Sequence, residues 1–95
     1  MVTAIVLINA ERERIRQTAE QLAELPGMAE VYSVAGPYDL VAIIRVSGND
    51  ELAEVVADRM REVNGVAKTT TLVAFRAYSR HDLDRMFGIG LEGDS

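Results

Sequence analysis

The sequence predicts one α+β domain whose elements follow each other in the order β-α-β-β-α-β. Four short apolar runs rich in β-branched residues flank two amphipathic segments of helical period. The two halves also resemble each other, because Leu25–Ala29 leads into the second strand much as Val63–Ala67 leads into the fourth. A length of 95 residues suits a single domain of this kind.

The first strand is predicted at Val2–Ile8, an apolar run of strand length that Asn9 closes. The first helix is predicted at Ala10–Leu25, and Pro26 and Gly27 end it. Its apolar positions fall on one side of a helix: Ile15, Ala19, Leu22 and Leu25.

The second strand is predicted at Ala29–Ala35 and the third at Leu40–Val46. Residues 36–39 between them form a turn in which Pro37 occupies a position whose φ it presets. The two strands are therefore expected to pair as a hairpin.

The second helix is predicted to start at Asn49, whose side chain can cap it, and to stop at Asn64 and Gly65. The fourth strand, at Lys68–Tyr78, is rich in threonine, valine and aromatic residues. The predicted buried stripe of the helix consists of Leu52, Val55, Val56, Met60 and Val63.

Right-handed crossovers place the first and third strands in the middle of a ferredoxin-like sheet, with both helices on one face. Those central strands carry apolar residues on both sides, and two helices cover only one side. An uncovered apolar face of that size promotes aggregation. We therefore expect the sheet of a second copy to cover it, giving a face-to-face dimer with two-fold symmetry, a dimeric α/β barrel.

Composition excludes several classes of function. A net charge of −5 gives no attraction for nucleic acid or anionic lipid. The absence of cysteine removes disulfides, thiolate catalysis and the usual zinc frameworks. No apolar run reaches the length of a membrane span, so a cytoplasmic location is expected. No cofactor or metal ligand set is predicted, although magnesium bound by carboxylates alone stays open.

The segment Gly36–Leu40 is the strongest candidate site for a small ligand. A tight turn exposes backbone N–H groups that can hold a carboxylate, and Asp39 offers an anion to an ammonium group. This pair of features suits an α-amino acid. The same residues are also common in turns that bind nothing.

Two further groups of polar residues carry weaker indications. The run Lys68–Thr71 opens the last strand with hydroxyls that can donate to a carboxylate, although threonine is also a good strand residue. His81 lies beside Ser79 and Asp82, but neighbours so close in sequence cannot form a catalytic relay toward a pocket. No catalytic residue is predicted.

Taken together, the element order, the Gly36–Leu40 turn and the threonine-rich strand resemble the effector-binding (RAM) domain of the Lrp/AsnC, or feast/famine, regulators over about residues 1–78. The resemblance implies dimers joined through their sheets and assembled into rings such as octamers or decamers, with amino acids or related metabolites bound between dimers. The ligand-binding positions that it implies are Ser33, Gly36, Tyr38, Asp39 and Leu40, with Thr69 and Thr71 from a neighbouring subunit.

The regulators of this family carry an N-terminal helix-turn-helix, whereas this chain starts in its first strand and so resembles stand-alone members. We expect a ligand-binding domain at residues 1–78 and a tail at residues 79–95 with one short helical turn. A full-length regulator of the same family, or an enzyme, is the expected downstream partner.

Three functions stay open at this level. The leading hypothesis is a non-catalytic amino-acid or metabolite sensor that self-assembles. The second is a cofactor-independent oxygenase or isomerase of the dimeric α+β-barrel type, although its cleft would need polar or titrating side chains where the central strands place apolar ones. The third is a structural assembly module that binds no ligand.

Overall fold

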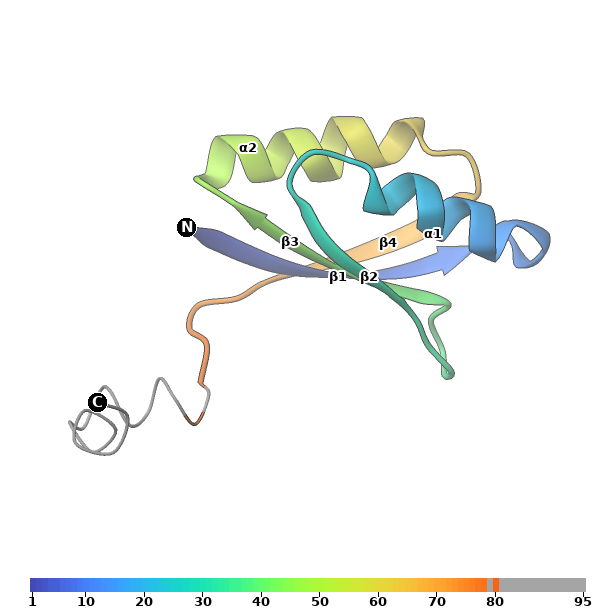
Figure 1. Cartoon of the computed structure of the whole chain (residues 1–95), viewed down its shortest axis with the longest axis horizontal. Helices are drawn as coiled ribbons and strands as arrows, with labels where there is room; N and C mark the ends of the chain where they lie inside the picture. The colour runs from blue at the N-terminus through green and yellow to red at the C-terminus, as the bar shows by residue number, and fades with distance from the viewer. Residues whose placement is uncertain (79, 81–95) are drawn as a thin grey trace.

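The computed structural model describes residues 1–78 and 80, which form one antiparallel sheet with all helical segments on one face (Figure 1). The strands are β1 (Val2–Ala10), β2 (Met28–Ser33), β3 (Leu40–Val46) and β4 (Val66–Val73), in the spatial order β2-β3-β1-β4. The ferredoxin-like arrangement is therefore confirmed. The short helix expected in the tail lies outside the described residues.

The helical segments are shorter and less regular than predicted. A 3-10 turn, η1 (Arg12–Arg14), precedes α1 (Ile15–Ala23), because β1 continues through Ala10. The second segment begins as α2 (Asn49–Ala53), continues as the π-helical η2 (Glu54–Arg59) and ends in the 3-10 turn η3 (Met60–Glu62). Its predicted stripe is buried except for Val56, which is half-buried.

The edge strands end earlier than the sequence indicated. β2 stops at Ser33, because the N–H of Val34 donates to the carbonyl of Asp39 (3.0 Å) and closes the hairpin loop there. β4 stops at Val73, since Ala74 forms the last bond, to Thr3 (2.9 Å), and β1 offers little more chain to pair with. The predicted strand ends at Ala35 and Tyr78 were wrong for this reason.

Alternate residues of the central strands face opposite sides of the sheet. One set packs under the helices and is almost completely buried: Ala4, Val6, Ile8, Leu40, Ala42, Ile44 and Val46. The other set lies on the face without helices, which we call the open face, and includes Ile5, Leu7, Val41 and Ile43 at half-buried positions. The expected two-sided apolar sheet is thus present, and its own helices cover only one side (Figure 1).

Backbone N–H and C=O groups also alternate along the two edge strands between the paired side and the free edge of the sheet. Because Ala74 donates to Thr3 and hydrogen bonding alternates along an antiparallel strand, the backbone of Thr69 and Thr71 points to the free edge of β4. The Val34 to Asp39 bond likewise leaves the backbone of Val31 and Ser33 on the free edge of β2. At both edges these residues carry side chains on the helix-covered face.

The start of α2 differs from the expected asparagine cap. Gly48 occupies the N-cap position and supplies no side-chain hydrogen bond. Instead, the Glu51 carboxylate accepts hydrogen bonds from the backbone N–H (3.2 Å) and the hydroxyl (2.9 Å) of Ser47. Both bonds favour the charged carboxylate, so they lower the pKa of Glu51.

This lowered pKa predicts a small pH dependence of stability. A carboxyl group whose pKa is lower in the folded state stabilises the fold above its unfolded pKa and loses that effect as the pH falls through the folded pKa. Glu51→Gln should therefore flatten the acid side of a plot of urea midpoint against pH. Glu24→Gln is the matched control, because Glu24 makes no side-chain hydrogen bond or ion pair within the described residues. An unchanged curve for Glu51→Gln would contradict the assignment.

Candidate functional site

The candidate site is built on the β2–β3 loop, residues 34–39. The Val34 to Asp39 hydrogen bond closes the loop at its base. Gly36 has φ of +142° and nothing within 4 Å of a Cβ built on it, so the glycine meets a backbone requirement rather than a lack of space.

Three hydrogen bonds fix this loop to the end of β1. The Asn9 side-chain amide donates to the Pro37 carbonyl (2.9 Å). The Asp39 N–H donates to the Ile8 carbonyl (2.9 Å), and the Ala10 N–H donates to Oδ2 of Asp39 (2.8 Å). The loop is therefore held rigidly against the central strand.

Asp39 thus has a structural task that the sequence did not reveal. One carboxylate oxygen, Oδ2, anchors the loop, while Oδ1 accepts no hydrogen bond within residues 1–78 and 80. The half-buried Tyr38 precedes it, and the expected contact of Asp39 with an ammonium group would use the remaining oxygen.

The loop also presents unused donors. Within the described part of the chain, the backbone N–H groups of Ala35, Gly36 and Tyr38 donate no hydrogen bond, and Pro37 has no N–H. Free N–H groups in a turn can hold an anion when they point to the same side. Free N–H groups and a carboxylate oxygen therefore occur together on one loop, as the chemistry of an α-amino acid requires.

The other predicted site residues are placed unequally. The Leu40 side chain is completely buried in the core, so only its backbone could meet a ligand. Ser33 is exposed at the free edge of β2. Thr69 lies on β4 beyond β1, because Ile8 pairs with Leu40 on one side and with Thr69 on the other. Two strand spacings, roughly 10 Å, therefore separate Thr69 from Leu40.

Within one copy, then, the loop and the threonines do not come together. Thr71 is farther along β4, opposite Val6. The expectation that Thr69 and Thr71 serve the loop of a neighbouring subunit stays a prediction.

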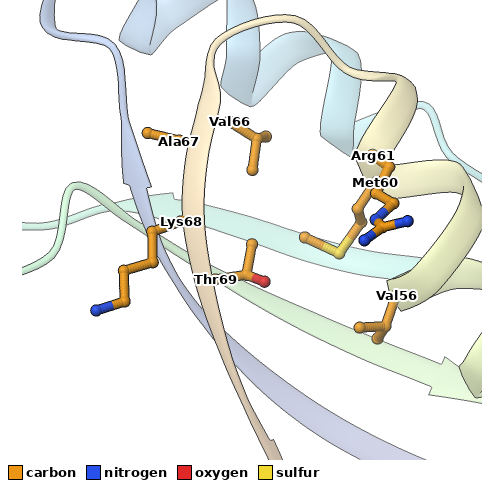
Figure 2. Close-up of a pocket in the computed structure, with 7 residues that line it drawn as sticks. All are labelled: Val56, Met60, Arg61, Val66, Ala67, Lys68 and Thr69. Atoms are coloured by element: carbon orange, nitrogen blue, oxygen red, sulfur yellow. The ribbon is translucent and has the colours of Figure 1, made fainter.

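A cavity that the sequence did not indicate lies between the second helical segment and the start of β4. Its volume is about 240 Å³, and it is lined by Val56, Met60, Arg61, Val66, Ala67, Lys68 and Thr69 (Figure 2). Of these, the sequence indicated Thr69 as a candidate site residue but not Arg61. No spacing pattern distinguishes Arg61 from the other eight arginines of the chain.

None of the helices among residues 1–78 and 80 has both the length and the apolar character needed to span a membrane. In the same residues, histidine, aspartate and glutamate side chains form no group of three that could hold a metal ion.

Comparison with known proteins agrees with the fold described above. The sequence model of the family described as the Lrp/AsnC ligand binding domain matches residues 3–83. An uncharacterized HTH-type transcriptional regulator of Pyrococcus abyssi is 41% identical over 76 residues, which cover 77% of this chain and 51% of that regulator. The chain spans about half the length of the curated relatives that it matches.

Two solved structures extend the comparison. TTHA0845 from Thermus thermophilus is 51% identical with a TM-score of 0.78, over 84% of this chain and 100% of that chain. The Neisseria meningitidis transcriptional regulator NMB0573, crystallised as a complex with L-Met, has a TM-score of 0.73 at 12% identity and covers 83% of this chain and 53% of that chain, which shows the shared fold alone. On the strength of the family model and the regulator relatives, this chain belongs to the Lrp/AsnC ligand-binding domain family.

Proposed function

We propose that this chain is a non-catalytic sensor that self-associates and binds an amino acid or related metabolite at the β2–β3 loop. The observation that carries the proposal is the loop itself, where the free N–H groups of Ala35, Gly36 and Tyr38 adjoin the second oxygen of Asp39. The first can hold a carboxylate and the second an ammonium group. The match to the family described as the Lrp/AsnC ligand binding domain supports a small-molecule ligand.

The open face supports association through the sheet. The apolar centre of this face consists of Ile5, Leu7, Val41 and Ile43, and no helix among residues 1–78 covers it; at its sides Leu72 is 48% exposed and Tyr32 49% exposed. A second copy of the same sheet is the simplest cover, since a two-fold axis lets one surface pair with itself. Burying this face would remove apolar area from water in both copies.

The edge strands favour the same dimer. The backbone groups at the free edge of β2 belong to Val31 and Ser33, and those at the free edge of β4 belong to Thr69 and Thr71. All four residues carry their side chains on the helix-covered face of the sheet. Antiparallel pairing of β2 with β4 of a second copy therefore keeps each side chain on its own face and closes the barrel. It would also bring the edge of Ser33 beside the edge of Thr69 and Thr71 in the second copy.

In this proposal, ligand binding would act on transcription by changing how the subunits assemble. Rings of dimers, or co-assembly with a full-length regulator, are the proposed active forms, because the curated relatives are HTH-type transcriptional regulators about twice as long as the matched region. A ligand shifts such an assembly only by its difference in affinity for the two states, typically about 1–3 kcal/mol.

A thermal-shift screen of amino acids, followed by calorimetry of the hits, tests the proposal, and Asp39→Asn sharpens it. Asparagine keeps an oxygen for the Ala10 N–H but removes the negative charge, so the fold should hold while affinity for an α-amino acid falls roughly tenfold or more. Asp39→Ala, in contrast, should also loosen the loop and lower stability by about 1–2 kcal/mol.

Asp58→Asn is the matched control, because this exposed aspartate makes no hydrogen bond or ion pair within the described residues. It should bind like the unaltered protein. Equal affinity of Asp39→Asn and Asp58→Asn would refute the role of the Asp39 charge, and no stabilisation by any amino acid would count against the loop as an amino-acid site.

A further inference from the structure

We propose that the cavity beside β4 is a second ligand site, which takes a small apolar carboxylate without an ammonium group, such as an α-keto acid. Arg61 is its anchoring cation. The β2–β3 loop does not line this cavity, although Thr69 does, and Thr69 is also expected to complete the loop site of a neighbouring subunit.

The shape of the cavity is set by residues from two elements. Val56 and Met60 come from the second helical segment, and Val66 and Thr69 come from β4 (Figure 2). Lys68 projects from the opposite side of β4, in agreement with its pairing to Asn9, so it contributes only its backbone region (Figure 2). The floor is therefore apolar, and Met60 is almost completely buried in it.

Arg61 is the charged side chain that this arrangement leaves for a ligand. It is exposed, and it makes no ion pair or side-chain hydrogen bond within the described residues. Its neighbour Arg59 is already engaged, since it pairs with Glu54 (3.3 Å) and donates to the carbonyl of Pro26 (2.8 Å). The guanidinium of Arg61 lies beside Met60 at the cavity (Figure 2).

The charges of the lining residues favour a carboxylate over an ammonium group in this cavity. None of the seven lining residues is acidic, although the whole chain carries a net charge of −5. An α-ammonium group would therefore find no anionic partner in the lining, and the positive charge of Arg61 would repel it. A carboxylate can pair with Arg61 and accept a hydrogen bond from the Thr69 hydroxyl, which makes none within the described residues.

The size of the cavity limits the ligand to a small one. A volume of about 240 Å³ is below the roughly 300–1,000 Å³ of sites for drug-sized molecules. A branched aliphatic chain suits the apolar floor, and the flexible thioether of Met60 can adjust to its shape.

Calorimetric titration of the full chain with α-ketoisocaproate tests the site, with leucine and the neutral α-ketoisocaproamide as comparison probes. We expect the keto acid to bind at least tenfold more tightly than either comparison probe. Arg61→Gln should weaken its binding roughly 10- to 100-fold, as loss of a hydrogen bond to a charged group requires.

Three variants test whether the keto acid binds in this cavity rather than elsewhere on the chain. Arg12→Gln is the matched control, since Arg12 is exposed and unpaired within the described residues, and it should leave binding unchanged. Asp50→Asn should also leave it unchanged, because Asp50 is exposed and does not line the cavity. Val56→Trp should fill the cavity and abolish binding while the circular dichroism spectrum is retained.

Several results would overturn the proposal. They are an absence of binding by the keto acid at millimolar concentration, equal binding by leucine or the amide, and full binding by Arg61→Gln. Loss of binding in Arg12→Gln would also overturn it, because Arg12 does not line the cavity.

Discussion

Replacing Gly65 with alanine should lower the free energy of unfolding by about 3 kcal/mol or more. Gly65 has φ of +100°, a conformation that L side chains rarely adopt. A Cβ at this position would also overlap the hydroxyl of Thr18, which is completely buried and donates to the Asn64 carbonyl (3.2 Å). Backbone strain and overpacking therefore act together. Urea unfolding at one fixed protein concentration measures the effect, because the proposed self-association would also stabilise the fold.

Gly36→Ala separates the two contributions. Gly36 also has a positive φ, but its Cβ would meet no atom within 4 Å, so alanine there should cost only about 1–2 kcal/mol. Adding Thr18→Ala to Gly65→Ala should recover part of the loss by removing the overlapping hydroxyl. Equal losses for the alanine variants at the two glycines would show that the contact with Thr18 has no energetic weight.

Ile43→Asp should convert the proposed dimer into a folded monomer. Ile43 lies on the open face opposite Ile5 and is only half-buried in a single copy, so a carboxylate is tolerated there until a second sheet covers it. The two-fold dimer would bury two such carboxylates without partners, and several kcal/mol for each corresponds to a loss of affinity of at least about a thousandfold. Sedimentation velocity at micromolar concentration reports the change, and circular dichroism reports the retained fold.

Ala53→Asp is the control for this variant, because Ala53 is exposed on α2, on the helix-covered side of the sheet. It should remain dimeric. A monomeric unaltered chain at the same concentration, or a dimeric Ile43→Asp, would remove the open face as the association surface.

The central part of the fold was predictable from the sequence because local and tertiary preferences agree there. β3 was predicted at its observed bounds, and its β-branched residues suit a strand that is apolar on both faces. The ends of β2 and β4 were not predictable, since the partner strand rather than composition decides where an edge strand stops. The burial of Thr18 was also not predicted. This polar residue of α1 is completely buried because its side chain packs against Gly65.

The candidate site was predictable in position but not in its internal contacts. The residue types of the Gly36–Leu40 segment indicate a turn. The bond between Asp39 and Ala10 joins residues 29 positions apart, and no local pattern encodes it. Arg61 was missed for the same reason, because its place beside Thr69 depends on how the second helical segment packs over β4.

The three bonds that tie the β2–β3 loop to β1 have a kinetic and entropic consequence for recognition. Under the proposed function, a metabolite that reaches this loop meets groups that these bonds already hold in place, so little chain freedom would be lost on capture. Association would then need no slow rearrangement of the loop. Competing metabolites should therefore differ in their dissociation rate constants rather than in their association rate constants.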